Sequence, residues 1–89
     1  MNVKNINGTT GRKAPHNQSW IQYYIQKADL NYTPFCCVCL CFNEAQVGAH
    51  VKKVGCNDDK WYIAPMCYEH NNKFGKILEI DDIELVPLP

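Results

Sequence analysis

The chain has 89 residues, a formal net charge of zero and six cysteines. A polypeptide this short buries a modest core, so we expect one domain over residues 1–89, held by an additional cross-link. A neutral chain gains little from counterion release, which argues against strong, sequence-independent binding of nucleic acid. No apolar run is long enough to span a membrane.

No apolar stretch typical of a secretory signal follows Met1. We therefore expect a reducing cytoplasm, where thiols persist and zinc is a better cross-link than a disulfide. The charge is unevenly placed: residues 1–35 carry four basic side chains and one acidic one, and residues 61–89 carry two basic and five acidic ones. The basic amino-terminal part can bind phosphate locally.

The amino-terminal part predicts a loop followed by one helix. Residues 1–17 are polar and partly flexible, with a short edge strand at VKNI (3–6). Ser19 is a good helix N-cap, and SWIQYYIQKAD has apolar residues at helical spacing. We expect a helix over residues 19–29 that ends before Pro34.

The middle of the chain predicts a cysteine-rich turn and a β-hairpin. FCCVCLC (35–41) suits a tight metal-binding knuckle. AQVGAHVKKV (45–54) and WYIAP (61–65) read as strands, and the residues at 55–59 have turn chemistry.

The carboxyl-terminal part predicts a short helix and two strands. Pro65 suits a helix start, residues 66–74 supply about two turns, and Gly75 is a C-cap. KILEI (76–80) and ELVPLP (84–89) read as short strands. The whole pattern indicates a small α+β fold with an amino-terminal helix.

Two spaced pairs of metal-binding residues stand out. Cys36-x-x-Cys39 forms the first pair, Cys67-x-x-His70 forms the second, and 27 residues separate them. Each spacing lets two side chains point at one tetrahedral ion, and four protein ligands close the coordination sphere. We therefore predict a structural Zn²⁺ site.

The choice among the cysteines stays open. Cys41 is the leading substitute for Cys39, Cys37 points away from its neighbour, and Cys56 lies in the predicted turn with a weaker claim. The competing interpretation is that cysteines serve as small buried hydrophobic residues. His50 has three interpretations: a general base, a zinc ligand that replaces a cysteine, or a structural histidine.

VGAHV, followed by WYIAPMCYEHNN, resembles the ββα-metal core of HNH endonucleases. This resemblance implies a treble-clef domain in which His50 is the general base and Asn71 binds a catalytic divalent metal such as Mg²⁺. It also implies that the two spaced pairs are structural zinc ligands.

Two positions depart from the HNH pattern. The residue before the base normally binds the catalytic metal, but here it is Ala49, and Tyr62 replaces the middle motif asparagine. A methyl group cannot ligate Mg²⁺, which requires oxygen ligands. We therefore expect a degenerate, non-catalytic zinc module that binds nucleic acid or a protein partner. The alternative is an active metal-dependent endonuclease with His50 as base, and a third hypothesis is a purely structural or regulatory protein.

Almost the whole chain is also similar to a group of small bacterial and phage zinc proteins with no settled activity. The similarity is carried by NVKNINGT, SWIQYY, VGAHVKKVG, WYIAPMC and LVPLP. It implies a fold and a zinc site without specifying an activity.

Overall fold

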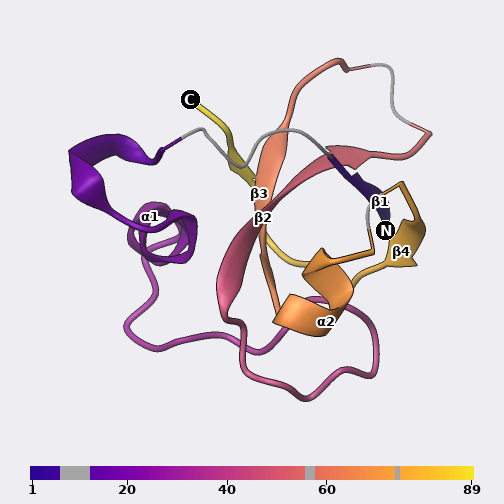
Figure 1. Cartoon of the computed structure of the whole chain (residues 1–89), viewed down its shortest axis with the longest axis horizontal. Helices are drawn as coiled ribbons and strands as arrows, with labels where there is room; N and C mark the ends of the chain where they lie inside the picture. The colour runs from indigo at the N-terminus through magenta and orange to yellow at the C-terminus, as the bar shows by residue number, and fades with distance from the viewer. Residues whose placement is uncertain (7–12, 56–57, 74) are drawn as a thin grey trace.

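The computed structural model describes residues 1–6, 13–55, 58–73 and 75–89. Within these residues the helices are η1 (Pro15–Asn17, a 3-10 turn), α1 (Trp20–Lys27) and α2 (Tyr68–Asn71). The strands are β1 (Asn2–Asn5), β2 (Val47–Lys53), β3 (Tyr62–Met66), β4 (Ile77–Glu79) and β5 (Val86–Pro87). They form one antiparallel sheet in the order β4-β1-β2-β3-β5, shown in Figure 1. The predicted α+β class is confirmed, and no helix in the described ranges is long and apolar enough to cross a membrane.

The predicted β-hairpin forms the centre of the sheet. β2 and β3 pair from Val47 opposite Met66 to Val51 opposite Tyr62. The strand expected near residues 3–6 is present, but it is not an edge strand, because β1 pairs with β2 on one side and with β4 on the other. The side chain of Val3 in β1 is fully buried, so this strand is part of the core.

Helix α1 begins where the sequence predicts. The Ser19 side chain accepts a hydrogen bond from the Gln22 backbone N–H, and the Gln22 side chain accepts one from the Ser19 N–H. This reciprocal capping box satisfies two N–H groups that the first helical turn leaves without partners. The regular helix ends at Lys27, and Asp29 adopts a positive φ of 57° just beyond it.

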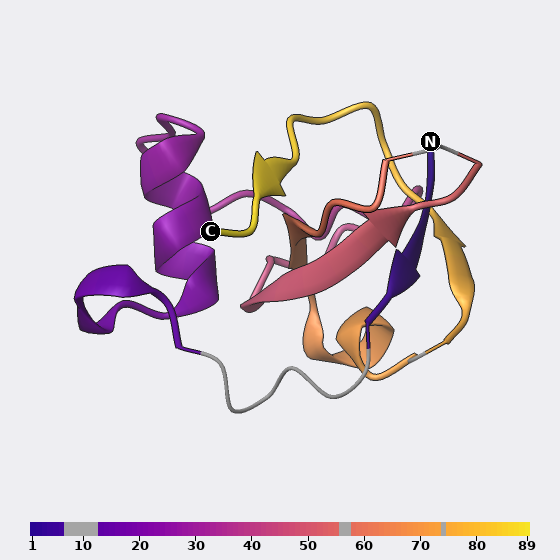
Figure 2. The same ribbon diagram turned by 90° about the horizontal axis from the view of Figure 1, so that it is seen from above.

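One face of the hairpin packs directly against α1, as Figure 2 shows. A Cβ atom built on Gly48 would lie only 2.5 Å from the carbonyl carbon of Trp20. Glycine at this position therefore allows the start of α1 to touch the backbone of β2. The Trp20 ring then meets the His50 ring edge-on, with centroids 4.9 Å apart.

The opposite face of the hairpin carries a second core that includes cysteines. Because successive strand residues point to opposite faces, Ala49 and Val51 face away from α1 and pack with Ala64, Cys36 and Cys67. The segment between α1 and β2 reaches this face by passing beside α2, at the bottom of Figure 1. The sheet thus separates a helix-covered face from a cysteine-bearing face.

The predicted second helix is wrong in its start and its length. Pro65 lies inside β3, opposite Gly48, and the helix begins only after Cys67, which is its N-cap. Asn72 is the C-cap, so α2 makes about one turn and ends before the predicted Gly75. The hairpin register explains the change, because continued pairing to Met66 keeps Pro65 extended.

Candidate metal centre

The cysteine-rich segment folds back on itself beside the sheet. Phe35 forms an isolated antiparallel bridge with Glu44, and the Cys36 N–H donates to the Asn43 carbonyl at 2.7 Å. A second bridge joins Val38 to Ile80, which follows β4. These contacts fix the segment at both its base and its tip, as expected for a metal-binding knuckle.

A tight turn at the tip of the knuckle presents Cys41. The Cys41 N–H donates to the Val38 carbonyl at 3.0 Å, and Leu40 has a positive φ of 65°. A hydrogen bond across four residues with positive φ at the third is characteristic of a type II turn. The turn reverses the chain between Val38 and Cys41, with Cys39 and Leu40 at its centre.

The other two ligand atoms come from the start of α2. Cys67 is its N-cap, and His70 follows one turn later, so the two side chains share one side of this short helix. The Cys67 Sγ and the His70 Nδ1 lie 3.2 Å apart. The length of α2 is therefore sufficient to position both side chains.

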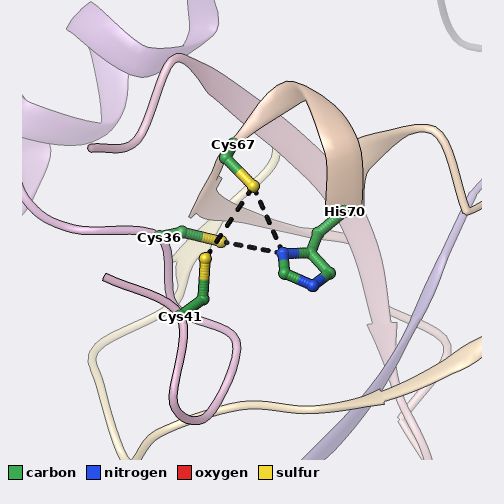
Figure 3. A group of neighbouring side chains, drawn as sticks. All are labelled: Cys36, Cys41, Cys67 and His70. Atoms are coloured by element: carbon green, nitrogen blue, oxygen red, sulfur yellow. Dashed lines mark hydrogen bonds between the residues drawn. The ribbon is translucent and has the colours of Figure 1, made fainter. Parts of the chain in front are cut away.

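Four side chains converge between the knuckle and α2 (Figure 3), namely Cys36, Cys41, Cys67 and His70. Their ligand atoms all lie within 4.8 Å of one another. The Cys36 Sγ is 3.6 Å from the His70 Nδ1, and the Cys41 Sγ is 4.0 Å from the Cys67 Sγ. In tetrahedral zinc sites, with Zn–S bonds of about 2.3 Å, neighbouring ligand atoms lie about 3.5–3.8 Å apart. This Cys₃His cluster therefore fits a structural Zn²⁺ ion in donor type and in spacing.

The two buried thiols of the cluster, Cys36 and Cys67, have different pKa values. Burial raises the pKa of Cys36 to about 12. Burial also acts to raise the pKa of Cys67, but hydrogen bonds with the His70 backbone and ring, and with Cys36 and Asn43, lower it to about 7. Cys67 is thus readily available as a thiolate near neutral pH. Because zinc binds the thiolate, metal binding must displace the Cys36 proton, and zinc affinity should fall as the pH falls.

Cys39 is not part of the cluster, although the two-residue spacing favoured it. Its N–H donates to the Glu79 carbonyl at 3.0 Å. Partial burial and a hydrogen bond with Asp81 raise the pKa of its thiol, so the side chain faces the segment after β4. The turn at Leu40 selects Cys41, the substitute that the sequence left open. The first pair is thus separated by four residues, which a Cys-x-x-Cys search does not detect.

Asn43 supports the cluster, although no pattern in the sequence indicates this role. Its carbonyl accepts the Cys36 N–H, and its side chain hydrogen-bonds to the Cys67 sulfur. A partner of this kind orients a metal ligand without binding the metal. Only the folded knuckle brings Asn43 back to a cysteine distant in sequence.

The remaining cysteines have other surroundings. Cys37 is buried, its N–H donates to the Pro65 carbonyl at 2.9 Å, and burial strongly raises its pKa. Cys56 lies outside the described residues. The cysteines that the structure describes are all free thiols.

His50 and Asn71, the two residues given catalytic roles by the HNH resemblance, meet different faces of the sheet. The buried His50 ring packs against Trp20 on the α1 face. Asn71 accepts hydrogen bonds from the Asn5 side chain, at 2.6 Å to its carbonyl and 3.4 Å to its side-chain oxygen. Asn5 lies two residues after Val3 in β1 and so shares the cysteine-bearing face. The structure therefore does not bring the two together.

Comparison of the chain with models of protein families, with curated protein sequences and with solved structures gives no match. The Cys₃His cluster in a small α+β domain is thus established by geometry alone. The resemblance to HNH endonucleases gains no support from these comparisons.

Proposed function

We propose that this protein is a small non-catalytic binding module whose fold is held by one structural Zn²⁺ ion. The single observation that carries the proposal is the convergence of three cysteines and one histidine from two distant segments. Four protein ligands leave no position for a reactive water, which is the arrangement of structural rather than catalytic zinc. Bound zinc would contribute folding free energy by tying the knuckle to α2.

We further propose that β2, β3 and α2 form a treble-clef unit of the degenerate HNH type. Support comes from their order, a hairpin followed by a short helix that carries Cys67 and His70. The positions of His50 and Asn71 argue against catalysis, as do Ala49 and Tyr62, whose apolar and phenolic side chains are buried in the cysteine-bearing core. Folded protein should leave plasmid DNA intact with Mg²⁺, Mn²⁺ or Ni²⁺, and nicking abolished by His50→Ala would restore the nuclease alternative.

Native mass spectrometry of purified protein tests the zinc proposal. We expect one zinc per chain, lost together with folded structure on treatment with a strong chelator. A thiol count on the same sample should find the cysteines reduced. Metal-free protein that stays compact, or protein with its cysteines joined in disulfides, would contradict the proposal.

A further inference from the structure

A hollow of about 330 Å³ lies beside the metal centre, between the end of α1, the start of the knuckle and the segment after β4. Its volume is at the lower end of the range for ligand pockets. The lining residues that matter here are three aromatic side chains and two carboxylates, namely Tyr24, Tyr32, Phe35, Asp81 and Glu84. None of the lining residues is a lysine or an arginine.

Two of the three aromatic side chains at this hollow are exposed, whereas Tyr24 is buried. Tyr32 is 61% exposed and Phe35 is 65% exposed. Further along the knuckle, outside the lining of the hollow, Leu40 and Phe42 are 88% and 77% exposed. Clustered apolar side chains on a small monomer typically mark an interaction surface.

The charged residues that line the hollow, Asp81 and Glu84, are both acidic. Residues 28–51 contain no lysine or arginine, and residues 77–89 carry four acidic side chains and no basic one. Asp82 lies 3.9 Å from the amino-terminal ammonium group. By contrast, Asp81 and Glu84 form no ion pair within the part of the chain that the structure describes. Zinc bound by three thiolates and a neutral histidine would add about one further negative charge beside the hollow, since Cys36 also lines it.

Backbone contacts hold the acidic segment in place. The Tyr24 hydroxyl donates to the Glu84 carbonyl at 2.6 Å, and the Asp81 N–H donates to the Cys37 carbonyl at 2.8 Å. Burial, with the nearby Cys37 and Glu84, raises the pKa of Tyr24 to about 12, so this phenol stays neutral. The two carboxylates are therefore attached to a fixed backbone, and a ligand would need little rearrangement to meet them.

We propose that this hollow binds an arginine side chain from a basic segment of a partner protein, with the guanidinium between the aromatic rings and the carboxylates of Asp81 and Glu84. A guanidinium stacks on aromatic faces and pairs with carboxylates through two parallel hydrogen bonds. The apolar stem of arginine suits the aromatic walls. The negative surroundings repel phosphate, so nucleic acid does not fit this hollow. The inference rests on the proposed function, because the zinc site holds the knuckle wall.

Titration with the peptide acetyl-Gly-Gly-Arg-Gly-Gly-amide, followed by NMR at low salt, tests the proposal. We expect saturable shifts of the Tyr24, Tyr32 and Phe35 signals. A peptide with glutamine in place of arginine should bind at least tenfold more weakly. Equal binding of the glutamine peptide, or shifts confined to another surface, would overturn the inference.

The chain offers a matched control for the carboxylates. Asp81→Asn and Glu84→Gln should each weaken arginine-peptide binding several-fold, whereas Asp82→Asn removes the same charge outside the hollow and should have little effect. Equal losses in all three variants would show attraction by net charge alone and would overturn the site.

Two further measurements separate other outcomes. Zinc content is measured on every sample. A zinc-loaded protein that does not bind the peptide contradicts only the arginine site, whereas a zinc-free folded protein contradicts the proposed function. Competition by short DNA at the same aromatic signals, or self-association through this hollow seen by sedimentation, would also overturn the inference, because the occupant would then be nucleic acid or a second copy.

Discussion

The two faces of the sheet are stabilised in different ways. On one face, a capped helix packs its aromatic side chains on the hairpin, so closely that only glycine fits at residue 48. On the other face, a knuckle without a regular helix or strand of its own meets a one-turn helix through three thiols and an imidazole. The helix face is held by packing alone, whereas on the cysteine-bearing face the proposed Zn²⁺ ion would add to the packing of the core. Each face can therefore be disrupted by a different kind of change.

The largest expected effect is on the cysteine-bearing face. Cys67→Ser removes the thiol whose pKa is lowered to about 7, and we expect zinc-free protein without a cooperative thermal transition. Zinc binding in small domains contributes about 10–16 kcal/mol, which matches or exceeds the roughly 5–15 kcal/mol total stability of a typical domain. Circular dichroism melting together with metal analysis checks this. Cys56→Ser, outside the described residues, is the control and should keep both zinc and a sharp transition. A sharp transition in the Cys67 variant would be incompatible with structural zinc.

The choice between Cys41 and Cys39 gives the next largest effect. Cys41→Ser should reduce zinc affinity by more than the roughly 10–100-fold cost of losing an outer-shell partner, because a direct ligand is lost. Cys39→Ser alters a thiol two residues away that faces Asp81, and it should leave zinc affinity nearly unchanged. Competition with a chromophoric chelator measures both. The reverse order would mean that the knuckle turn in solution presents Cys39.

Sequence patterns predicted the local features of this molecule better than the distant ones. Ser19 and the apolar spacing after it located α1, and strand alternation located the hairpin, because both depend on neighbouring residues. The start of α2 was misplaced because Pro65 fits a first helical turn and also fits an extended strand. The outcome depended on the pairing of Pro65 with Gly48 in β2, which the residue type at position 65 does not reveal.

The metal centre shows the same limit. The spacing of Cys67 and His70 is a local property of a helix start, and both residues reach the cluster. The partner cysteine depends on a positive φ at Leu40, a residue type that rarely adopts this conformation. Nothing in the cysteine spacing indicates that turn. The role of Asn43 depends on the same folded knuckle.

A smaller effect is expected on the helix face. Gly48→Ala forces a methyl group against the Trp20 backbone, and the resulting separation of α1 from β2 should cost about 3 kcal/mol, at the upper end for overpacking. Gly55→Ala is a useful comparison, because no described residue other than its chain neighbours lies within 4 Å of the added methyl. Only its positive φ of 79° is strained, which should cost about 1 kcal/mol.

Denaturant unfolding of zinc-loaded protein measures both glycine variants. Both should still bind zinc, since neither touches the knuckle or α2. Loss of zinc from the Gly48 variant would show that the two faces are coupled. The hypothesis that they are stabilised independently would then be wrong.

The smallest effect concerns a side chain that contacts a ligand without being one. Asn43→Ala removes the hydrogen bond to the Cys67 sulfur, whereas the backbone carbonyl of residue 43 can still accept the Cys36 N–H. We expect about a tenfold loss of zinc affinity, at the low end for an outer-shell partner, with little change in the thermal transition of the zinc-saturated protein.

Chelator competition at several pH values checks this. The deficit should grow as the pH is lowered toward and below 7, because Cys67 without this hydrogen bond holds its proton more tightly. A loss of zinc affinity that does not depend on pH would instead show that Asn43 stabilises the conformation of the knuckle rather than the Cys67 thiolate.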